Sequence, residues 1–314
     1  MTDAAAIRAV QPTRPRPITV LSYGVGIDST AMLIELHARG ETPDLVLTAD
    51  TEAENPVTYA FLIFMQKWMD ERGIAHAVVR HEVKRLGKHP PYHGLFQSLL
   101  VNACLPSIAF GFHTCSQKHK ISPQDAYIRA WPPAAAAIAA GQPIVRLVGL
   151  DAGPRDSQRY AHAATITRDD FDTQFPLRSW NWDRDRCTQR ILDAGITPPP
   201  KSSCGFCLGM RPEELRVLPA FWHHRIVLLE ARAQPRLRTV EGLWRRSTKS
   251  RPGSMTKFLE AEGLVSPSLA AWIKTHALAS LDQFLTDAAA SEPVNREPLD
   301  TWIAWFDSAT AARA

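Results

Sequence analysis

The chain has 314 residues, 45% of them hydrophobic, and its 36 lysines and arginines slightly outnumber its 32 acidic residues. The length suits one large or two modest domains, and the hydrophobic content is enough for a core. No run approaches the ~18 to 20 apolar residues that a membrane span needs. The odd number of cysteines, five, and the lack of a signal peptide argue against a disulfide-built secreted protein. We therefore expect a cytoplasmic protein without a membrane partner.

Strands and helices alternate through the first half of the sequence, after a segment at 1–17 that we expect to be flexible. The patterns predict strands near 18–22, 45–49, 76–82 and 145–150, and helices near 28–39, 56–72, 94–104 and 123–131. Such alternation is typical of a parallel sheet with helices on both faces, here over residues 18–165. From 166 to 314 the sequence shifts to Trp, Pro, Cys and helical segments, and we expect a mostly helical, cysteine-containing region.

The first strand-to-helix corner carries a pattern typical of a phosphate site. Glycines allow close backbone approach, and a helix N-terminus offers free N–H groups and a positive dipole end. The corner lacks the lysine of a P-loop and has Ser29 where a dinucleotide fingerprint has its third glycine. Asp28 would repel phosphate unless a divalent cation lay between them, which favours a magnesium-bound triphosphate over NAD. The expected contacts are Ser22, Gly24, Gly26, Asp28, Ser29 and Thr30.

This corner resembles the pyrophosphate loop of the PP-loop ATP pyrophosphatases, in detail that of the phosphoadenylyl-sulfate (PAPS) reductase-like family. The family's Ser-Gly-Gly reads Gly24-Val25-Gly26 here, and Ser22 offers a hydroxyl two residues earlier. The resemblance covers roughly residues 18–215. It implies a Rossmann-like, adenine nucleotide alpha hydrolase-like fold that uses ATP and Mg²⁺ and cleaves ATP between the α and β phosphates.

Three further segments match the family. Asp50 and Thr51 follow the second strand, with Glu52 in the place of the family's glycine, and Asp50 is a candidate for a metal, the ribose or the adenine edge. The resemblance implies that Lys118 or Lys120 neutralises phosphate charge as ATP is split. Arg155, in the turn after the strand near 145–150, is a candidate contact for the polyphosphate or for an acidic substrate.

Four of the cysteines are candidates for an all-thiolate metal site. Cys204 and Cys207 form a Cys-x-x-Cys turn, which supplies half a site; Cys187 lies upstream and Cys115 in the lysine segment. A 4Fe–4S cluster and a zinc ion both accept four thiolates. Resemblance to iron–sulfur members of the family favours the cluster, with zinc as the alternative. A thioredoxin-like pair or free buried thiols remain open interpretations, and Cys104 is expected in the core.

Between 232 and 251 the chain holds seven basic residues and one acid, with Trp244 among them. A basic stretch with an aromatic suits contact with a nucleic-acid backbone; the alternative is an ordinary solvated surface. The aromatics after Leu264 are expected in helices with their rings in the core.

The resemblance leads to one main functional expectation. The protein would adenylate a substrate, release pyrophosphate and support sulfur transfer to a nucleic acid, by tRNA thiolation or DNA sulfur modification, with a sulfur-donor protein as a candidate partner and a homodimer left open. One alternative is a reductase of adenylyl sulfate or phosphoadenylyl sulfate, although no cysteine follows Cys207. The other is a nucleotide- or nucleic-acid-binding module with a structural zinc.

Overall fold

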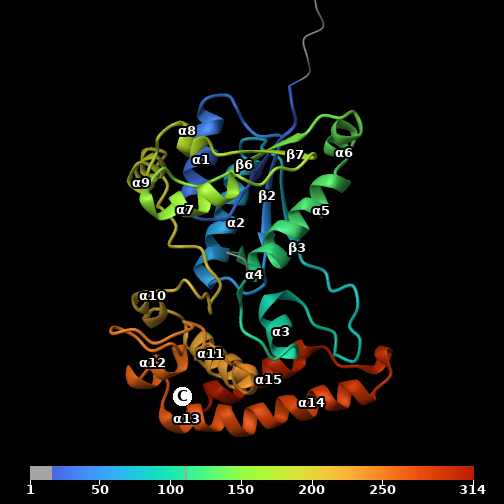
Figure 1. Ribbon diagram of the computed structural model, residues 1–314, viewed down its shortest axis with the longest axis vertical. Coiled ribbons are helices and arrows are strands. Elements are labelled where there is room, and N and C mark those ends of the chain that lie inside the picture. The colour runs from blue at the N-terminus through green and yellow to red at the C-terminus, as the bar shows by residue number, and fades with distance from the viewer. Residues whose placement is uncertain (1–15, 110–111) are drawn as a thin grey trace, which may run out of the picture.

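The computed structural model describes residues 16–109 and 112–314, so the predicted flexible segment 1–17 lies almost wholly outside the described residues. Within them one five-stranded parallel sheet has the order β3-β2-β1-β6-β7. Its strands are β1 (Thr19–Ser22), β2 (Leu45–Asp50), β3 (His76–Arg80), β6 (Ile144–Val148) and β7 (Phe171–Gln174). Helices flank this sheet (Figure 1), which confirms the predicted α/β, Rossmann-like arrangement.

Alternate residues of the strands pack against different helices, because successive side chains point to opposite faces of a sheet. Leu21 joins the cluster under α1 (Ile27–Ala38), α2 (Pro56–Asp70) and α9 (Arg184–Asp193). Val20 joins the cluster under α5 (Ser122–Ala130) and α6 (Pro132–Ala139). β1 therefore lies at the centre of three layers, with its carboxyl end between those of β2 and β6.

Strand β7 was not predicted. Only Phe171 of its four residues is buried, and the three that follow are polar, so the segment lacks the apolar run of the other strands. β7 pairs in parallel with β6, and α9 packs its buried Cys187 and Ile191 into the core that it shares with α1. The α/β unit thus continues past residue 165, the boundary expected from the sequence.

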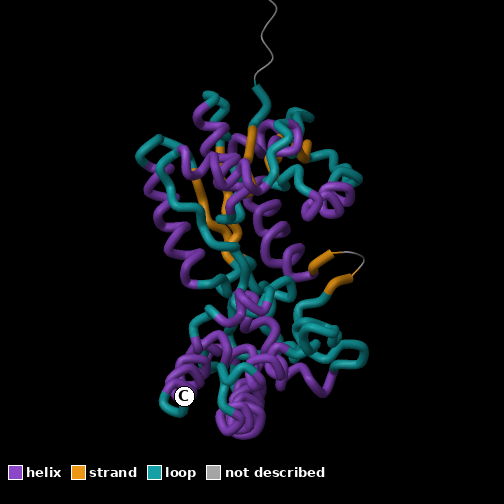
Figure 2. Tube along the Cα trace, turned by 90° about the vertical axis from the view of Figure 1, so that its left-hand side faces the viewer, coloured by secondary structure: helices purple, strands orange, loops and turns teal. Residues whose placement is uncertain are grey.

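A second, mostly helical region lies below the sheet (Figure 1), and the two regions are stacked along the long axis (Figure 2). Its own core includes the buried Trp302 and Phe306, as predicted, whereas Trp305 is 43% exposed. The elements here are α3 (Gly94–Val101), α10 (Pro212–Arg216), α11 (Ala220–Ala233), η2 (Gln234–Arg236), α12 (Met255–Ala261), α13 (Pro267–Trp272), η3 (Ile273–Ala277), α14 (Leu278–Ala290), η4 (Pro293–Asn295) and α15 (Leu299–Ala311). None of the helices in the described ranges combines the length and apolarity that crossing a membrane requires.

The expectation that Cys104 lies in the core is wrong. Helix α3 ends at Val101, and the chain turns there with Ala103 in a left-handed conformation at φ 46°. This turn leaves Cys104 exposed as a free thiol, although the apolar residues before it are buried.

The remaining short elements connect the two regions or complete the α/β unit. They are β4 (Ile108–Ala109), β5 (Phe112–His113), α4 (Thr114–Ser116), the π-helix η1 (Gln117–Ile121), α7 (Pro154–Ala163) and α8 (Pro176–Ser179). The loop after β2 contacts the helical region directly: Glu54 forms an antiparallel bridge with Cys204, and His93 lies between Glu52 (3.0 Å) and Asp300 of α15 (2.8 Å).

A buried ion-pair group ties the last two strands to α5. Asp125 accepts from Arg146 of β6 at 2.5 Å and from Arg168 at 2.7 Å. Both guanidinium groups lie over the ring of Phe171, the first residue of β7, at 4.2 and 4.6 Å. Arg146 is a charge inside the sheet layer, 7% exposed, and Asp125 is its counter-ion.

We expect Asp125→Asn to destabilise the protein by about 3 kcal/mol or more, because it leaves the Arg146 charge buried without a carboxylate partner. Urea unfolding followed by circular dichroism measures the loss. The control is Asp70→Asn, since Asp70 pairs with His76 at the surface, where removing a partner costs about 0–1 kcal/mol. Equal stability of the two variants would contradict this account of the sheet.

Candidate functional site

The glycine turn after β1 leads into a helix whose first amides are left without side-chain caps. Gly26 is the N-cap residue of α1 and makes no side-chain cap bond. The Ser29 hydroxyl lies 3.3 Å from both the Gly24 N–H and the Gly26 carbonyl, which holds the turn closed on the helix. Val25 has φ 57°, a left-handed conformation that is strained for a β-branched residue and that clusters at functional sites. The turn is therefore a fixed structure with free N–H groups at a helix start.

The turn after β6 packs tightly against this helix start. A Cβ atom at Gly149 would lie 3.0 Å from the Ser29 nitrogen and 3.1 Å from its Cα, so only glycine fits there without moving backbone. β1 and β6 are neighbours in the sheet, so the two turns lie side by side beyond the carboxyl ends of these strands. Ligands of open α/β sheets bind at such a point, beyond the carboxyl ends of the strands.

Three carboxylates meet at this point. Oxygens of Asp28 (α1), Asp151 (after β6) and Asp156 (α7) all lie within 4.8 Å of one another, and the residues are 8%, 2% and 3% exposed. Asp28 Oδ1 and Asp156 Oδ2 are buried and have no hydrogen-bond partner among the described residues. Buried polar atoms are almost always paired, and carboxylate oxygens are the ligands that Mg²⁺ prefers. The donor set therefore fits a divalent cation.

Two arginines partly balance these carboxylates. Arg184, at the start of α9, lies 2.8 Å from Asp28 and 3.5 Å from Asp151, and Arg159 lies 2.8 Å from Asp156. Burial nevertheless raises the pKa of Asp28 to about 6, because desolvation and the two other carboxylates outweigh Arg184. A further positive charge among the three carboxylates, such as a bound cation, would relieve that penalty.

The structure brings only part of the predicted phosphate-contacting set to the open side of the turn. Gly24, Gly26, Asp28 and Ser29 form the turn and the first helical turn. Ser22 instead donates to Gln124 of α5 at 2.8 Å. Thr30 is fully buried with its hydroxyl 3.0 Å from that of Tyr23, so its side chain belongs to the core.

The loop after β2 lies beside the same corner. Asp50 accepts from the Glu52 N–H and the Tyr59 hydroxyl and pairs with Arg80, so its oxygens already have partners. Glu52, which stands where the predicted resemblance has a glycine, has φ 56°, a left-handed conformation that glycine adopts without strain. The turn therefore adopts the left-handed conformation with a glutamate in place of the glycine.

The predicted cationic residues have different surroundings. Lys118 donates to Ser98 at 3.2 Å. Lys120 donates to Glu54 at 2.8 Å, and the neighbouring Glu54 raises the pKa of Lys120 despite its burial. Both lysines lie on the π-helix η1, an irregularity frequent at functional sites. Arg155 is exposed near the start of α7 and has no ion-pair partner among the described residues.

The four candidate metal-binding cysteines divide into two places. Cys115, Cys204 and Cys207 belong to the core of the helical region or pack against it, and Cys204 Sγ lies 3.4 Å from the Thr51 hydroxyl. Cys187 is fully buried in the core shared by α1 and α9. There burial, with smaller contributions from Asp28 and Asp151, raises the pKa of Cys187 to about 12.

The separation of Cys187 from the other three cysteines bears on the predicted four-thiolate site. A tetrahedral zinc site needs sulfurs about 4 Å apart, and within the described ranges only the three aspartates are gathered that closely. These four cysteines therefore do not fit a preformed four-thiolate zinc site, because Cys187 lies in a different core from the other three.

The cysteine turn nevertheless touches the glycine turn. A Cβ at Gly26 would lie 3.1 Å from the Ser202 hydroxyl. The Asn55 N–H donates to the Ser203 carbonyl at 3.1 Å, and the Gly205 N–H donates to the Ala53 carbonyl at 3.0 Å. The segment before Cys204 thus runs across the glycine turn after β1 and the loop after β2, which places the Cys204 thiol next to the candidate site.

Sequence reasoning did not assign Asp151, Asp156 or Arg184 to the site. The position of Asp151 and Asp156 just after a strand next to β1 is a signal that could have identified them, since that strand end adjoins the glycine turn. Arg184 had no such signal, because its place depends on how α9 packs against α1.

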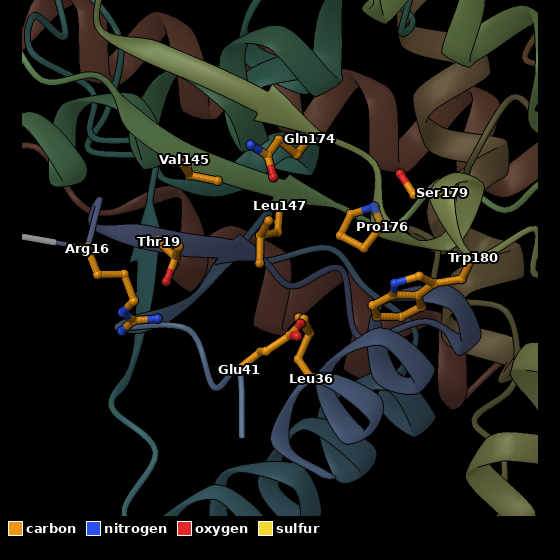
Figure 3. Close-up of a pocket in the computed structure, with 10 residues that line it drawn as sticks. All are labelled: Arg16, Thr19, Leu36, Glu41, Val145, Leu147, Gln174, Pro176, Ser179 and Trp180. Atoms are coloured by element: carbon orange, nitrogen blue, oxygen red, sulfur yellow. The ribbon is translucent and has the colours of Figure 1, made fainter. Parts of the chain in front are cut away.

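A cavity of about 300 Å³ lies elsewhere on the α/β unit. Figure 3 shows its lining residues on β1, on β6 and at the end of β7, together with Leu36 near the end of α1 and Trp180. Its walls are mostly apolar, and Trp180 is covered on one side by the Arg39 guanidinium at 4.2 Å. It holds none of the three clustered carboxylates and is separate from the carboxyl-end site.

Comparison of the chain with protein-family models and with curated proteins found no match.

The elevated pKa of Asp28 predicts how stability depends on pH. Its ordinary value, 3.8, applies to the unfolded chain, and folding raises it to about 6. The contribution of Asp28 to stability therefore falls as pH rises from about 4 to about 6, because the unfolded chain loses this proton first. We expect Asp28→Asn to be the more stable protein at pH 7.5 without divalent cations, by about 2–3 kcal/mol, with the difference vanishing near pH 4. Thermal unfolding at both pH values measures it; a variant less stable than the parent at pH 7.5 would contradict the prediction.

A cation bound by the carboxylates should stabilise the folded protein, since a ligand that binds only the native state raises its stability. We expect millimolar Mn²⁺ to raise the melting temperature of the parent and of Asp185→Asn, whose carboxylate is exposed in the first turn of α9. The same cation should leave the melting temperature of Asp156→Asn unchanged. An equal rise in all three proteins would place the cation elsewhere.

Proposed function

We propose that this protein is an ATP-dependent enzyme of the PP-loop class that transfers the adenylyl group of ATP to an oxygen atom of its substrate and releases pyrophosphate. The observation that carries the proposal is the carboxylate trio, with its two buried unpartnered oxygens, at the uncapped start of α1. A triphosphate and a divalent cation complement this arrangement in charge and in hydrogen bonding.

The side chains suggest how the site would work. Asp28, Asp151 and Asp156 would hold Mg²⁺, which would neutralise the charge that develops on the departing pyrophosphate. The free amides of α1 and the guanidinium groups of Arg184 and Arg159 supply further fixed positive charge at the same corner. The substrate oxygen would attack the α phosphorus, and the bond to the bridging oxygen of the pyrophosphate would break.

The thiols favour sulfur chemistry on the activated substrate. Cys204 lies among Thr51, Glu54 and Lys120 directly beside the nucleotide corner. A sulfur nucleophile at this place would form a carbon–sulfur bond while the carbon–oxygen bond to AMP breaks. We therefore retain sulfur transfer to a nucleic acid as the proposed reaction, with the sulfur supplied by a donor protein.

Release of pyrophosphate from ATP tests the proposal. We expect magnesium-dependent release by the parent and a loss of at least 100-fold in Asp156→Asn, whereas Asp185→Asn stays within about twofold. Full activity of Asp156→Asn would contradict the proposed site. Reduction of adenylyl sulfate to sulfite, with no pyrophosphate formed from ATP, would favour the reductase alternative.

A further inference from the structure

Residues 236–251, which run from the last residue of η2 toward α12 and are here called the basic loop, concentrate positive charge. In the part of the chain that the structure describes, none of its cations has a carboxylate within ion-pair distance, whereas nearby Arg216 and Lys274 pair with Glu262 and Glu260. Its one acid, Glu241, already accepts from the N–H and the hydroxyl of Ser247. The cations are Arg236, Arg238, Arg245, Arg246, Lys249 and Arg251.

Hydrogen bonds to the buried Glu230 and the burial of Trp244 hold the basic loop in place. Glu230 of α11, 5% exposed, accepts from the N–H groups of Leu243 (2.7 Å) and Met255 (2.9 Å) and from the Ser254 hydroxyl (2.5 Å). Trp244 is buried and donates to the Met210 carbonyl at 2.8 Å. The cations of the basic loop, which have no carboxylate partner among the described residues, are therefore held at fixed positions. The loop projects between α10 and α12 (Figure 1).

The basic loop adjoins the cysteine turn. The carbonyl of Met210, three residues after Cys207, accepts from Trp244 and also from Arg251 at 3.4 Å. The other side of the same turn contacts Gly26 through Ser202. A polyanion on the basic loop would thus lie on the side of the thiols opposite the nucleotide corner.

We propose that the basic loop binds the sugar–phosphate backbone of double-stranded nucleic acid, a role that rests on the proposed function and names its substrate class. Fixed cations without carboxylate partners match a row of phosphates. The burial of Trp244 removes the aromatic platform that single-strand binding uses. None of the described exposed large apolar side chains belongs to the loop, so the surface lacks the groups that would enter a membrane.

Binding of a fluorescent 20-base-pair duplex, measured by anisotropy at several salt concentrations, tests this role. The test variant is Arg238→Gln/Arg246→Gln/Lys249→Gln, which removes three exposed charges. We expect its affinity at 100 mM salt to fall at least tenfold, with the slope of log affinity against log salt shallower by about 2–3. The matched control, Arg216→Gln/Lys274→Gln, removes two ion-paired surface charges and should stay within twofold of the parent.

DNA and RNA duplexes of one sequence show which is preferred, and either result supports the proposal if the single strands bind more weakly. Equal binding by the triple variant and the parent, tighter binding of single strands, or no binding by the parent would each overturn it. Circular dichroism verifies that the variant is folded. The two proposals fail separately: duplex binding without pyrophosphate release contradicts only the ATP chemistry, and pyrophosphate release without duplex binding contradicts only the basic loop.

Discussion

Three buried carboxylates meet where the chain leaves β1 and β6, and the candidate site depends on them. Like charges at this distance repel, and burial removes the water that would screen them. Ion pairs with Arg184 and Arg159 offset part of this repulsion. Two carboxylate oxygens nevertheless remain unpartnered, and the pKa of Asp28 stays elevated. A fold selected for stability alone would not keep this cluster, so we interpret it as a place prepared for a cation and the phosphates it accompanies.

The surrounding backbone is organised for the same purpose. Val25 and Glu52 both hold left-handed conformations in the turns after neighbouring strands, and Gly149 allows the turn after β6 to touch the start of α1. The segment before Cys204 then closes over the corner, through Ser202 and the bridge with Glu54. The glycine turn, the thiols and the basic loop thus follow one another along the junction of the two regions, an order that suits the proposed activation of a large anionic substrate.

Much of the α/β unit could be predicted from the sequence, because its strands are short apolar runs and its helices follow each run directly. The expected strand at 45–49 and helix at 28–39 correspond closely to β2 and α1. β7 gave no such signal, since only Phe171 is buried. The grouping of the cysteines could not be predicted either: a buried thiol on an amphipathic helix looks the same whether it faces a metal or, like Cys187, a neighbouring helix. Arg184 joins the site only through the packing of α9 against α1.

The most direct test of the central claim is a crystal soaked with Mn²⁺ and a non-hydrolysable ATP analogue, with the metal located by its anomalous scattering. The account predicts one anomalous peak within coordination distance of Asp28, Asp151 and Asp156, with the triphosphate of the analogue against the start of α1. A peak at the cysteines alone, or a triphosphate bound away from the glycine turn, would contradict it.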